Sequence, residues 1–238
     1  MNLKDKVAIV TGASDGIGKQ VALKLAKEGV SLALVARNKE RLAEVKQNCL
    51  SLGSPRVETY VCDLKLKDDI KATVESIKSD FGNVQILLNI AGVWQKVGQL
   101  EEASLENIEE VISTNLIGVV MMTNLVLPIL RQQEESAIIN VSSHSGIEAK
   151  NGQSIYCASK WGVTGFNESL RLDLKGSNVR VAGLYQGGTR TGLFEKANDP
   201  KDAEQFDKFT EPADLADVVI FMLSRPPKIW LHDVRVEY

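Results

Sequence analysis

The chain has few of the residues on which metal and disulfide chemistry depend. Its 238 residues include only three cysteines, Cys49, Cys62 and Cys157, and two histidines, His144 and His232. The cysteines are odd in number and widely spaced, with no C-x-x-C pair, so neither a disulfide framework nor a zinc site is supported. No tight cluster of carboxylates accompanies the histidines. A metal-dependent mechanism is therefore not expected.

The sequence also lacks a strong excess of charge and the apolar segments of membrane proteins. A net charge of -3 gives no electrostatic reason to expect nucleic acid or an anionic membrane as a partner. The amino terminus has no apolar core or cleavage site of a signal peptide. No apolar run is expected to reach the roughly 20 residues that a membrane span requires. These absences favour a cytoplasmic protein.

What the chain does contain is an alternation of apolar and helical segments. A hydrophobic share of 44% over 238 residues is typical of one globular α/β domain, here residues 1–238. Repeated β-α-β units with short links predict a doubly wound fold, with a mostly parallel, seven-stranded sheet and helices on both faces. The expected strands are 7–11, 32–36, 57–62, 85–89, 137–141, 179–184 and the alternating segment 228–238, and the expected helices are 17–28, 39–49, 68–81, 105–130 and 153–174.

The helix expected over 153–174 carries Tyr156 and Lys160, which are four residues apart and therefore project from one face. An ammonium beside a phenol favours the ionised form of the phenol, so this pair resembles a tuned acid and base. Ser143 follows the apolar run 137–141, which puts its hydroxyl at a strand's carboxyl end, where open α/β sheets bind ligands. A Tyr/Lys pair is also a common amphipathic surface feature, and context decides between the two interpretations.

A glycine turn provides that context. Gly12, Gly16 and Gly18 follow the first expected strand and lead into the first expected helix. Because glycine lacks a Cβ, such a turn permits close backbone approach to a diphosphate at the helix N-terminus. Ser14, Asp15 and Ile17 belong to the same turn and are expected at the cofactor.

With these motifs, the chain resembles the short-chain dehydrogenase/reductase family over nearly its whole length. The G-x-x-x-G-x-G spacing is the form used in this family, and Ser143 stands thirteen positions before Tyr156, as is usual there. The resemblance implies a Rossmann fold and hydride transfer to or from a nicotinamide. It implies that Ser143 and Tyr156 bind the carbonyl oxygen, that Tyr156 supplies the proton, and that Lys160 lowers the tyrosine pKa and holds the ribose. Asn115 would kink its helix and hold a relay water, although a simple buried hydrogen bond is its alternative role.

Arg37 is expected to select the cofactor. In dinucleotide-binding sheets, an acidic residue after the second strand binds the ribose hydroxyl, whereas an arginine accommodates the 2'-phosphate. Arg37 follows Ala36, and neither position holds a carboxylate. Because a guanidinium can grip a phosphate with two hydrogen bonds, NADP(H) is expected to be preferred over NAD(H). A solvated residue at a helix start is the other interpretation of Arg37.

By resemblance, three further short segments are expected to contact the cofactor. They are Asp63 and Leu64 at the adenine, the turn with Asn89, Ala91 and Gly92, and Gly187, Thr189 and Thr191 near the carboxamide and diphosphate. Asp63 is equally suited to cap the following helix.

Several positions depart from the family pattern. Ile90 replaces the second asparagine of the family's Asn-Asn-Ala-Gly turn, and Gln186 replaces the proline after the sixth strand. Residues 228–238 lack the Gly-Gly ending common in relatives, which puts the usual tetramer interface in doubt. A homodimer or homotetramer is expected by resemblance only.

Three functions stay open from the sequence. The first is reversible, NADPH-dependent reduction of a carbonyl to an alcohol on a small or medium-sized substrate. The second is a 3-oxoacyl-carrier-protein reductase, which needs a basic patch for an acidic carrier, and no dense Lys/Arg cluster is visible. The third is an inactive NADP(H)-binding regulator, against which the filled Ser143, Tyr156 and Lys160 positions argue. The polar segment 193–211 is expected to form a mobile flap over the substrate.

Overall fold

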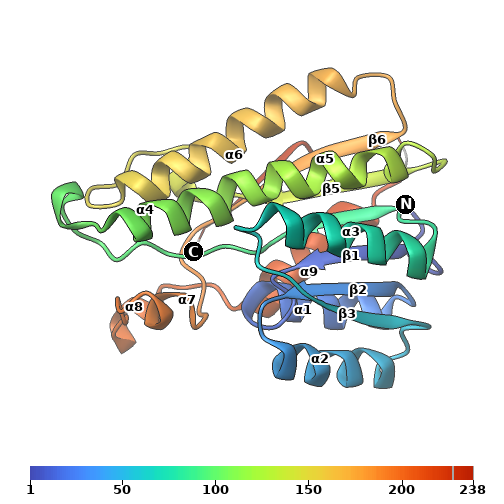
Figure 1. Cartoon of the computed structure of the whole chain (residues 1–238), viewed down its shortest axis with the longest axis horizontal. Coiled ribbons are helices and arrows are strands. Elements are labelled where there is room, and N and C mark those ends of the chain that lie inside the picture. The colour runs from blue at the N-terminus through green and yellow to red at the C-terminus, as the bar shows by residue number, and fades with distance from the viewer. Residues whose placement is uncertain (227, 238) are drawn as a thin grey trace.

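The computed structural model describes residues 1–226 and 228–237 and contains one twisted sheet (Figure 1). Within these residues the sheet has seven strands in the order β3-β2-β1-β4-β5-β6-β7, and all neighbours pair in parallel. The strands are β1 (Val7–Thr11), β2 (Ser31–Ala36), β3 (Val57–Val61), β4 (Ile86–Asn89), β5 (Ser136–Val141), β6 (Val179–Gln186) and β7 (Asp233–Val236). The predicted sheet is confirmed. Tyr238, the last residue of the predicted final strand, lies outside the described residues.

Helices cover both faces of this sheet, as the alternation of segments predicted. One face carries α1 and α9, with α2 beside them, and the other carries α3, α5 and α6 (Figure 1). The long helices are α1 (Gly16–Lys27), α2 (Lys39–Ser51), α3 (Lys67–Phe81), α4 (Leu105–Ile112), α5 (Gly118–Leu130), α6 (Ser154–Asp173) and α9 (Pro212–Leu223). The doubly wound Rossmann fold is therefore confirmed.

The inner strands are largely apolar because both of their faces are covered. Along β1, Val10 packs into the core below α1 and α9, while its neighbour Ile9 packs into the core below α3 and α5. All six residues of β5 are buried. Such continuous burial is typical of parallel strands, and removal of this apolar surface from water is the main stabilising contribution to the fold.

The expected helix 105–130 is a continuous helical segment with a wide turn inside it. Helices α4 and α5 are joined by a π-helical turn over Ser113–Ile117. A π turn closes its hydrogen bonds over five residues instead of four, and it is frequent at functional sites. Asn115 lies in this turn, so the predicted irregularity at this residue is present as a widened turn.

The same segment, Leu105–Leu130, is long and apolar enough by length and composition to cross a membrane. This differs from the expectation that no apolar stretch reaches that length. The physical reason lies in the fold, because Met122, Val126 and Ile129 of α5 are buried in the core that α5 shares with the sheet. A core helix between a sheet and other helices has the same composition as a membrane span.

The carboxyl ends of the parallel strands bring distant residues to one edge of the sheet. Gly12 follows β1, Arg37 follows β2, Ile90 follows β4, Ser143 lies two residues past β5, and Gly187 follows β6. In open α/β sheets this edge is where ligands bind. The fold therefore gathers the predicted site residues along one crevice.

The segment 193–211 contains two short helices, α7 (Leu193–Lys196) and α8 (Ala203–Asp207), which lie apart from the two main helix layers (Figure 1). Its aromatic side chains pack on one another. The ring centroids of Phe194 and Phe209 are 5.4 Å apart, and those of Phe206 and Phe209 are 5.6 Å apart. The mobility of this segment stays a prediction.

Candidate active site

The glycine turn after β1 is tightly packed against the turn after β4. Gly12 has a φ of +70°, and a Cβ added there would lie 2.8 Å from the Cα of Ala91. A Cβ on Gly18 would lie 2.3 Å from the carbonyl oxygen of Gly12. Larger residues at these positions would push apart the two turns and the start of α1. The absence of side chains thus sets the N-terminus of α1 directly on the crevice, where its unpaired N–H groups can bind an anion.

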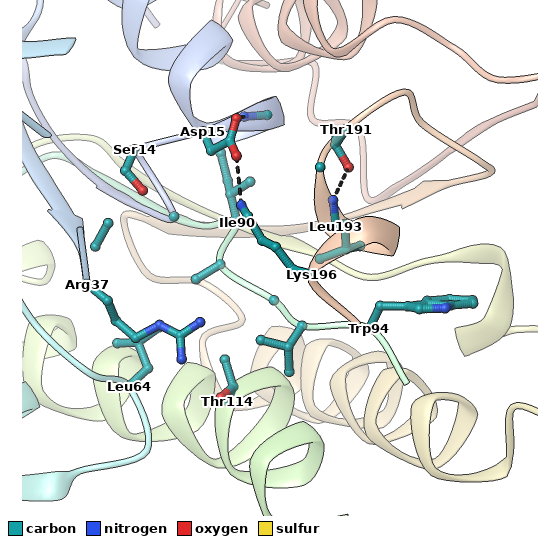
Figure 2. Close-up of a pocket in the computed structure, with 18 of the residues that line it drawn as sticks. Ser14, Asp15, Arg37, Leu64, Ile90, Trp94, Thr114, Thr191, Leu193 and Lys196 are labelled. Carbon is teal, nitrogen blue, oxygen red and sulfur yellow. Dashed lines mark hydrogen bonds and ion pairs between the residues drawn. The ribbon is translucent and has the colours of Figure 1, made fainter. Parts of the chain in front are cut away.

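An elongated pocket of about 640 Å³ runs along the carboxyl edge of the sheet (Figure 2). Its size falls within the usual range for ligand sites. Fourteen of the predicted cofactor residues line it, namely Gly12, Ser14, Asp15, Gly16, Ile17, Gly18, Arg37, Asp63, Leu64, Ala91, Gly92, Tyr156, Lys160 and Thr191. The structure therefore brings together residues from six separate chain segments.

Cationic side chains gather at the glycine turn. The Arg41 Nη1 atom lies 2.9 Å from the Oδ2 of Asp15, and the Lys196 Nζ lies 2.7 Å from the same oxygen (Figure 2). Arg37 enters the pocket from the end of β2, with its Nη1 3.4 Å from the Oε1 of Glu110. These charges and the N-terminus of α1 fit a polyphosphate, so the residues present are suited to a dinucleotide.

Asp15 organises these cations and also caps α1. Its Oδ1 accepts a hydrogen bond of 2.8 Å from the backbone N–H of Gly16. Burial acts to raise the pKa of the Asp15 carboxyl, but the hydrogen bonds from Lys196 and Gly16 hold that pKa below its ordinary value. The carboxylate therefore stays ionised at neutral pH.

Sequence inspection missed Arg41 and Lys196 as pocket residues. Arg41 was in principle detectable, because it lies four positions after Arg37, in the first turn of α2. Lys196 gave no comparable signal, because its partner Asp15 is 181 residues away in the sequence.

Tyr156 is buried between the pocket and a neighbouring aromatic side chain. Its ring centroid lies 4.5 Å from that of Trp94, edge to face, and its backbone N–H donates a hydrogen bond of 2.9 Å to the Oε1 of Gln95. Burial raises the pKa of Tyr156 to about 12, although a hydrogen bond with the Ser143 hydroxyl acts in the opposite direction. The predicted pair of hydroxyls, Ser143 and Tyr156, is thus in contact.

Lys160 is buried one helical turn after Tyr156. Its Nζ donates a hydrogen bond of 3.0 Å to the carbonyl oxygen of Val141, at the end of β5, and lies 5.7 Å from the ring centroid of Tyr156. Burial lowers the pKa of Lys160 to about 8. The pKa of Tyr156 was expected to be lowered by Lys160, yet in this structure burial of the phenol outweighs any such effect.

The side chain of Asn115 is occupied by the loop after β4. Its Oδ1 accepts a hydrogen bond of 2.8 Å from the N–H of Val93, while its Nδ2 donates to the Val93 carbonyl at 2.9 Å and to the Ser159 hydroxyl at 3.2 Å. Asn115 does not line the pocket. Its amide ties the pocket loop to α6, which matches the alternative of a buried hydrogen bond, and the relay water stays a prediction.

The side chain of Asn89 also lies away from the pocket, and the cofactor contact expected at this residue stays a prediction. Its Nδ2 donates to the Oγ1 of Thr123 at 3.0 Å and to the Oδ1 of Asn140 at 2.7 Å. A residue at a strand end can face either side of the sheet, and here Asn89 faces the buried layer below α5.

A second cavity of about 280 Å³ adjoins Tyr156, and Trp94 lines both this cavity and the long pocket. Ser143 lines it, together with Gly187 and Thr189, which were expected at the cofactor. The Thr189 hydroxyl lies 3.3 Å from that of Thr210. The predicted residues therefore divide between a long pocket and a smaller one, with Tyr156 at their junction.

This combination of glycine turn, crevice and strand order is typical of α/β proteins that bind a dinucleotide. Comparison with known families makes the class specific, because the family model described as short chain dehydrogenase matches residues 6–202. The chain belongs to this family of oxidoreductases, whose members act on CH–OH or C=O groups.

Related sequences align with nearly the full length of this chain. An uncharacterized oxidoreductase of Staphylococcus saprophyticus is 34% identical over 99% of this chain and 98% of its own length. A 3-oxoacyl-[acyl-carrier-protein] reductase of Thermotoga maritima is 33% identical over 94% of this chain and 92% of its own.

Solved structures of related oxidoreductases share this fold. A metagenomic short-chain oxidoreductase in complex with NADP is 29% identical, with a TM-score of 0.85 over 99% of this chain and 98% of the other. Neighbours of the same fold have been solved with NAD or NADH. A nicotinamide cofactor is supported, and the comparisons leave the choice between NADP(H) and NAD(H) open.

The burial of Lys160 predicts how stability depends on pH. Because its folded pKa lies near 8 and its ordinary value is 10.5, the unfolded chain binds more protons between these values. This group's contribution to the free energy of unfolding therefore rises with pH across that window. The variant Lys160→Met should be more stable than the parent at pH 7 and should flatten this rise.

Urea unfolding at pH 7, 8, 9 and 10 measures both effects, and Lys175→Met, at an exposed position, is the matched control. A Lys160→Met protein that is less stable at pH 7 and keeps the parent's slope would contradict this account of the buried ammonium.

Proposed function

We propose that this protein catalyses the reversible, NADPH-dependent reduction of a carbonyl to an alcohol on a small or medium-sized substrate. The observation that supports it is the convergence of Ser143, Tyr156 and Lys160 at the junction of the two cavities. The long pocket suits the dinucleotide, and the smaller one suits the substrate. Both reach the same phenol.

Each of these side chains has a role that follows from its surroundings. Ser143 and Tyr156 line the same smaller cavity, so a carbonyl oxygen placed between them would accept from both hydroxyls. Tyr156 then donates its proton to that oxygen as negative charge develops there. The cofactor, when bound, supplies the hydride that reduces the carbonyl carbon.

Lys160 positions groups around the phenol. Its ammonium is anchored to the Val141 carbonyl, and its remaining N–H donors are suited to the ribose hydroxyls of a dinucleotide in the long pocket. A protonated Lys160 close to Tyr156 stabilises the phenolate left after proton donation. Burial strengthens this interaction, because charges are poorly screened away from water.

The preference for NADPH rests on Arg37 and Arg41. Arg37 has a side chain that is 54% exposed and is paired with Glu110 at 3.4 Å. An exposed pair of this length contributes little free energy, so Arg37 can exchange Glu110 for the 2'-phosphate at low cost. Arg41, in the first turn of α2, adds a second positive charge to the lining of the same pocket.

A second candidate is reduction of a 3-oxoacyl group carried on an acyl-carrier protein. The 33% identity to the Thermotoga maritima enzyme of that name favours it. This activity requires a surface that binds an acidic carrier, and the sequence shows no dense basic cluster. A panel of ketones, dicarbonyls, alcohols and 3-oxoacyl thioesters, run with both NADPH and NADH, separates the two activities from an inactive binder.

The proton-donor role predicts the effect of Tyr156→Phe. The substitution keeps the ring and removes the hydroxyl, so the rate of NADPH oxidation with an activated ketone should fall at least about tenfold, because positioned acid/base groups contribute about a hundredfold or more. Tyr60→Phe is the matched control, since that phenol hydrogen bonds to Asp80 away from the pocket. Equal rates in parent and Tyr156→Phe would remove Tyr156 from the mechanism.

The cofactor preference predicts the effect of Arg37→Ala. Loss of a charge-assisted hydrogen bond to the 2'-phosphate should raise the Kd of NADPH by about tenfold or more and leave that of NADH nearly unchanged. Fluorescence titration with each cofactor measures both constants, with Arg56→Ala as a control outside the pocket. An unchanged ratio of the two constants would defeat the phosphate assignment.

A further inference from the structure

The smaller cavity beside Tyr156 has basic side chains on its wall, and the carboxylates that pair with Lys150 and Lys201, those of Glu148 and Asp199, do not line it. Among the described residues that line it, the basic side chains are His144, Lys150 and Lys201, and none is a carboxylate. Its volume of about 280 Å³ suits a short molecule. Aromatic rings of Trp94 and Phe194 form part of the same wall.

Lys201 is held in place by a partly buried ion pair. Its side chain is 13% exposed, and its Nζ lies 2.7 Å from the Oδ2 of Asp199. The same oxygen accepts a hydrogen bond of 2.8 Å from the indole N–H of Trp94. Burial acts to raise the pKa of Asp199, but the hydrogen bonds from Lys201 and Trp94 hold it below its ordinary value. Asp199 thus stays charged and joins the segment 193–211 to the loop after β4.

The ion pair is oriented with its positive end toward the cavity. Lys201 lines the cavity, whereas Asp199 does not. The ammonium lies 5.3 Å from the ring centroid of Phe194 and 6.0 Å from that of Trp94, within the range of cation–π attraction. An ammonium has three donors, and within the described residues Asp199 is the one hydrogen-bond acceptor found for it.

These features have a common chemical consequence. Burying an ion pair costs desolvation free energy, and that cost is offset only when further partners satisfy the charged groups. A carboxylate entering the cavity would take a second charge-assisted hydrogen bond from Lys201, in surroundings where such a bond is strong. A neutral ester or ketone offers no equivalent partner.

We propose that the substrate is a short carbonyl compound that also carries a carboxylate, an oxo acid in the reductive direction. Lys201 binds the carboxylate while the carbonyl oxygen lies against Ser143 and Tyr156, and Trp94 forms the wall between. This inference rests on the proposed function and narrows its substrate class. Lys201 is then a specificity-determining residue of the same site.

The test compares short 2-oxo, 3-oxo and 4-oxo acids with their methyl esters, which differ only in the charged group. With NADPH, at least one acid should exceed its ester in kcat/KM by about tenfold to a hundredfold, the value of a hydrogen bond to a charged group. The separation of carbonyl and carboxylate in the preferred acid reports the distance from Tyr156 to Lys201. Esters that are reduced as well as or better than every matched acid would overturn the inference.

Substitutions of Lys201 test whether this residue causes the preference for the acid over its ester. Lys201→Gln should abolish it by raising KM for the acid by a larger factor than KM for the ester, so that the acid-to-ester ratio of kcat/KM falls to about one, and Lys201→Arg should retain it. Lys208→Gln is the matched control, because Lys208 lies in the same segment, pairs with Glu204 and does not line the cavity. An acid preference that survives in Lys201→Gln would overturn the assignment.

Asp199→Asn separates substrate binding from a merely structural role. The amide oxygen can still accept from Trp94, while the competing negative charge beside Lys201 is gone, so the acid preference should be kept or increased. If the ion pair served only to hold the segment in place, Asp199→Asn and Lys201→Gln would lower the rates for acid and ester equally.

Failure of this inference is distinguishable from failure of the proposed function. Rapid reduction of esters and simple ketones without acid preference overturns the inference and leaves the proposed function standing. Absence of turnover for every compound contradicts the proposed function. Calorimetric titration of the oxo acids into the NADP⁺-loaded protein then decides the inference, since binding of acids but not esters supports it and equal or absent binding overturns it.

Discussion

All described strands of this sheet run in one direction, and that constraint decides where the candidate site can form. Because the strands share one direction, the loops that follow them all emerge at one edge of the sheet. The crossover helices that connect parallel strands cover both faces of the sheet. Residues as distant in sequence as Gly12, Arg37, Val141 and Gln186 therefore line one pocket. The backbone turns there can contact a ligand, whereas the central strands β4 and β5 are fully buried.

Burial at this edge has opposite effects on the pKa values of Tyr156 and Lys160, both of α6. It raises the pKa of Tyr156 to about 12 and lowers that of Lys160 to about 8, so both effects favour the uncharged forms. When either group becomes charged, a neighbouring group must therefore stabilise that charge by a hydrogen bond or an opposite charge. Ser143 and the Val141 carbonyl provide such contacts within the protein, and a bound dinucleotide and substrate would provide others.

Polar contacts outside the pocket hold the loop after β4 in its position beside the pocket. Asn115, in the π turn, holds the loop after β4 through Val93, and this loop carries Trp94. Trp94 contacts Tyr156 on one side and Asp199 on the other. The position of the phenol is thus linked to the segment 193–211 through a single indole, which explains how a residue of that segment can influence substrate choice.

Much of this arrangement follows from local sequence patterns. The apolar runs, the glycine turn and the four-residue spacing of Tyr156 and Lys160 each depend on neighbours in the chain, and the structure has all of them. The direction of the Asn89 side chain and the pairing of Lys196 with Asp15 depend on contacts between distant segments, to which no local pattern corresponds. The contact of Trp94, which lines both cavities, with Asp199 likewise joins residues that are 105 positions apart.

The central claim is that Ser143, Tyr156 and Lys160 surround the reactive carbon of a bound nicotinamide. A crystal structure of the protein with NADP⁺ tests it most directly. The account predicts a diphosphate at the N-terminus of α1, ribose hydroxyls within hydrogen-bond distance of Lys160 Nζ, and a nicotinamide C4 that faces the smaller cavity beside Tyr156. A nicotinamide bound outside the crevice, or turned with C4 away from Tyr156 and Ser143, would contradict it.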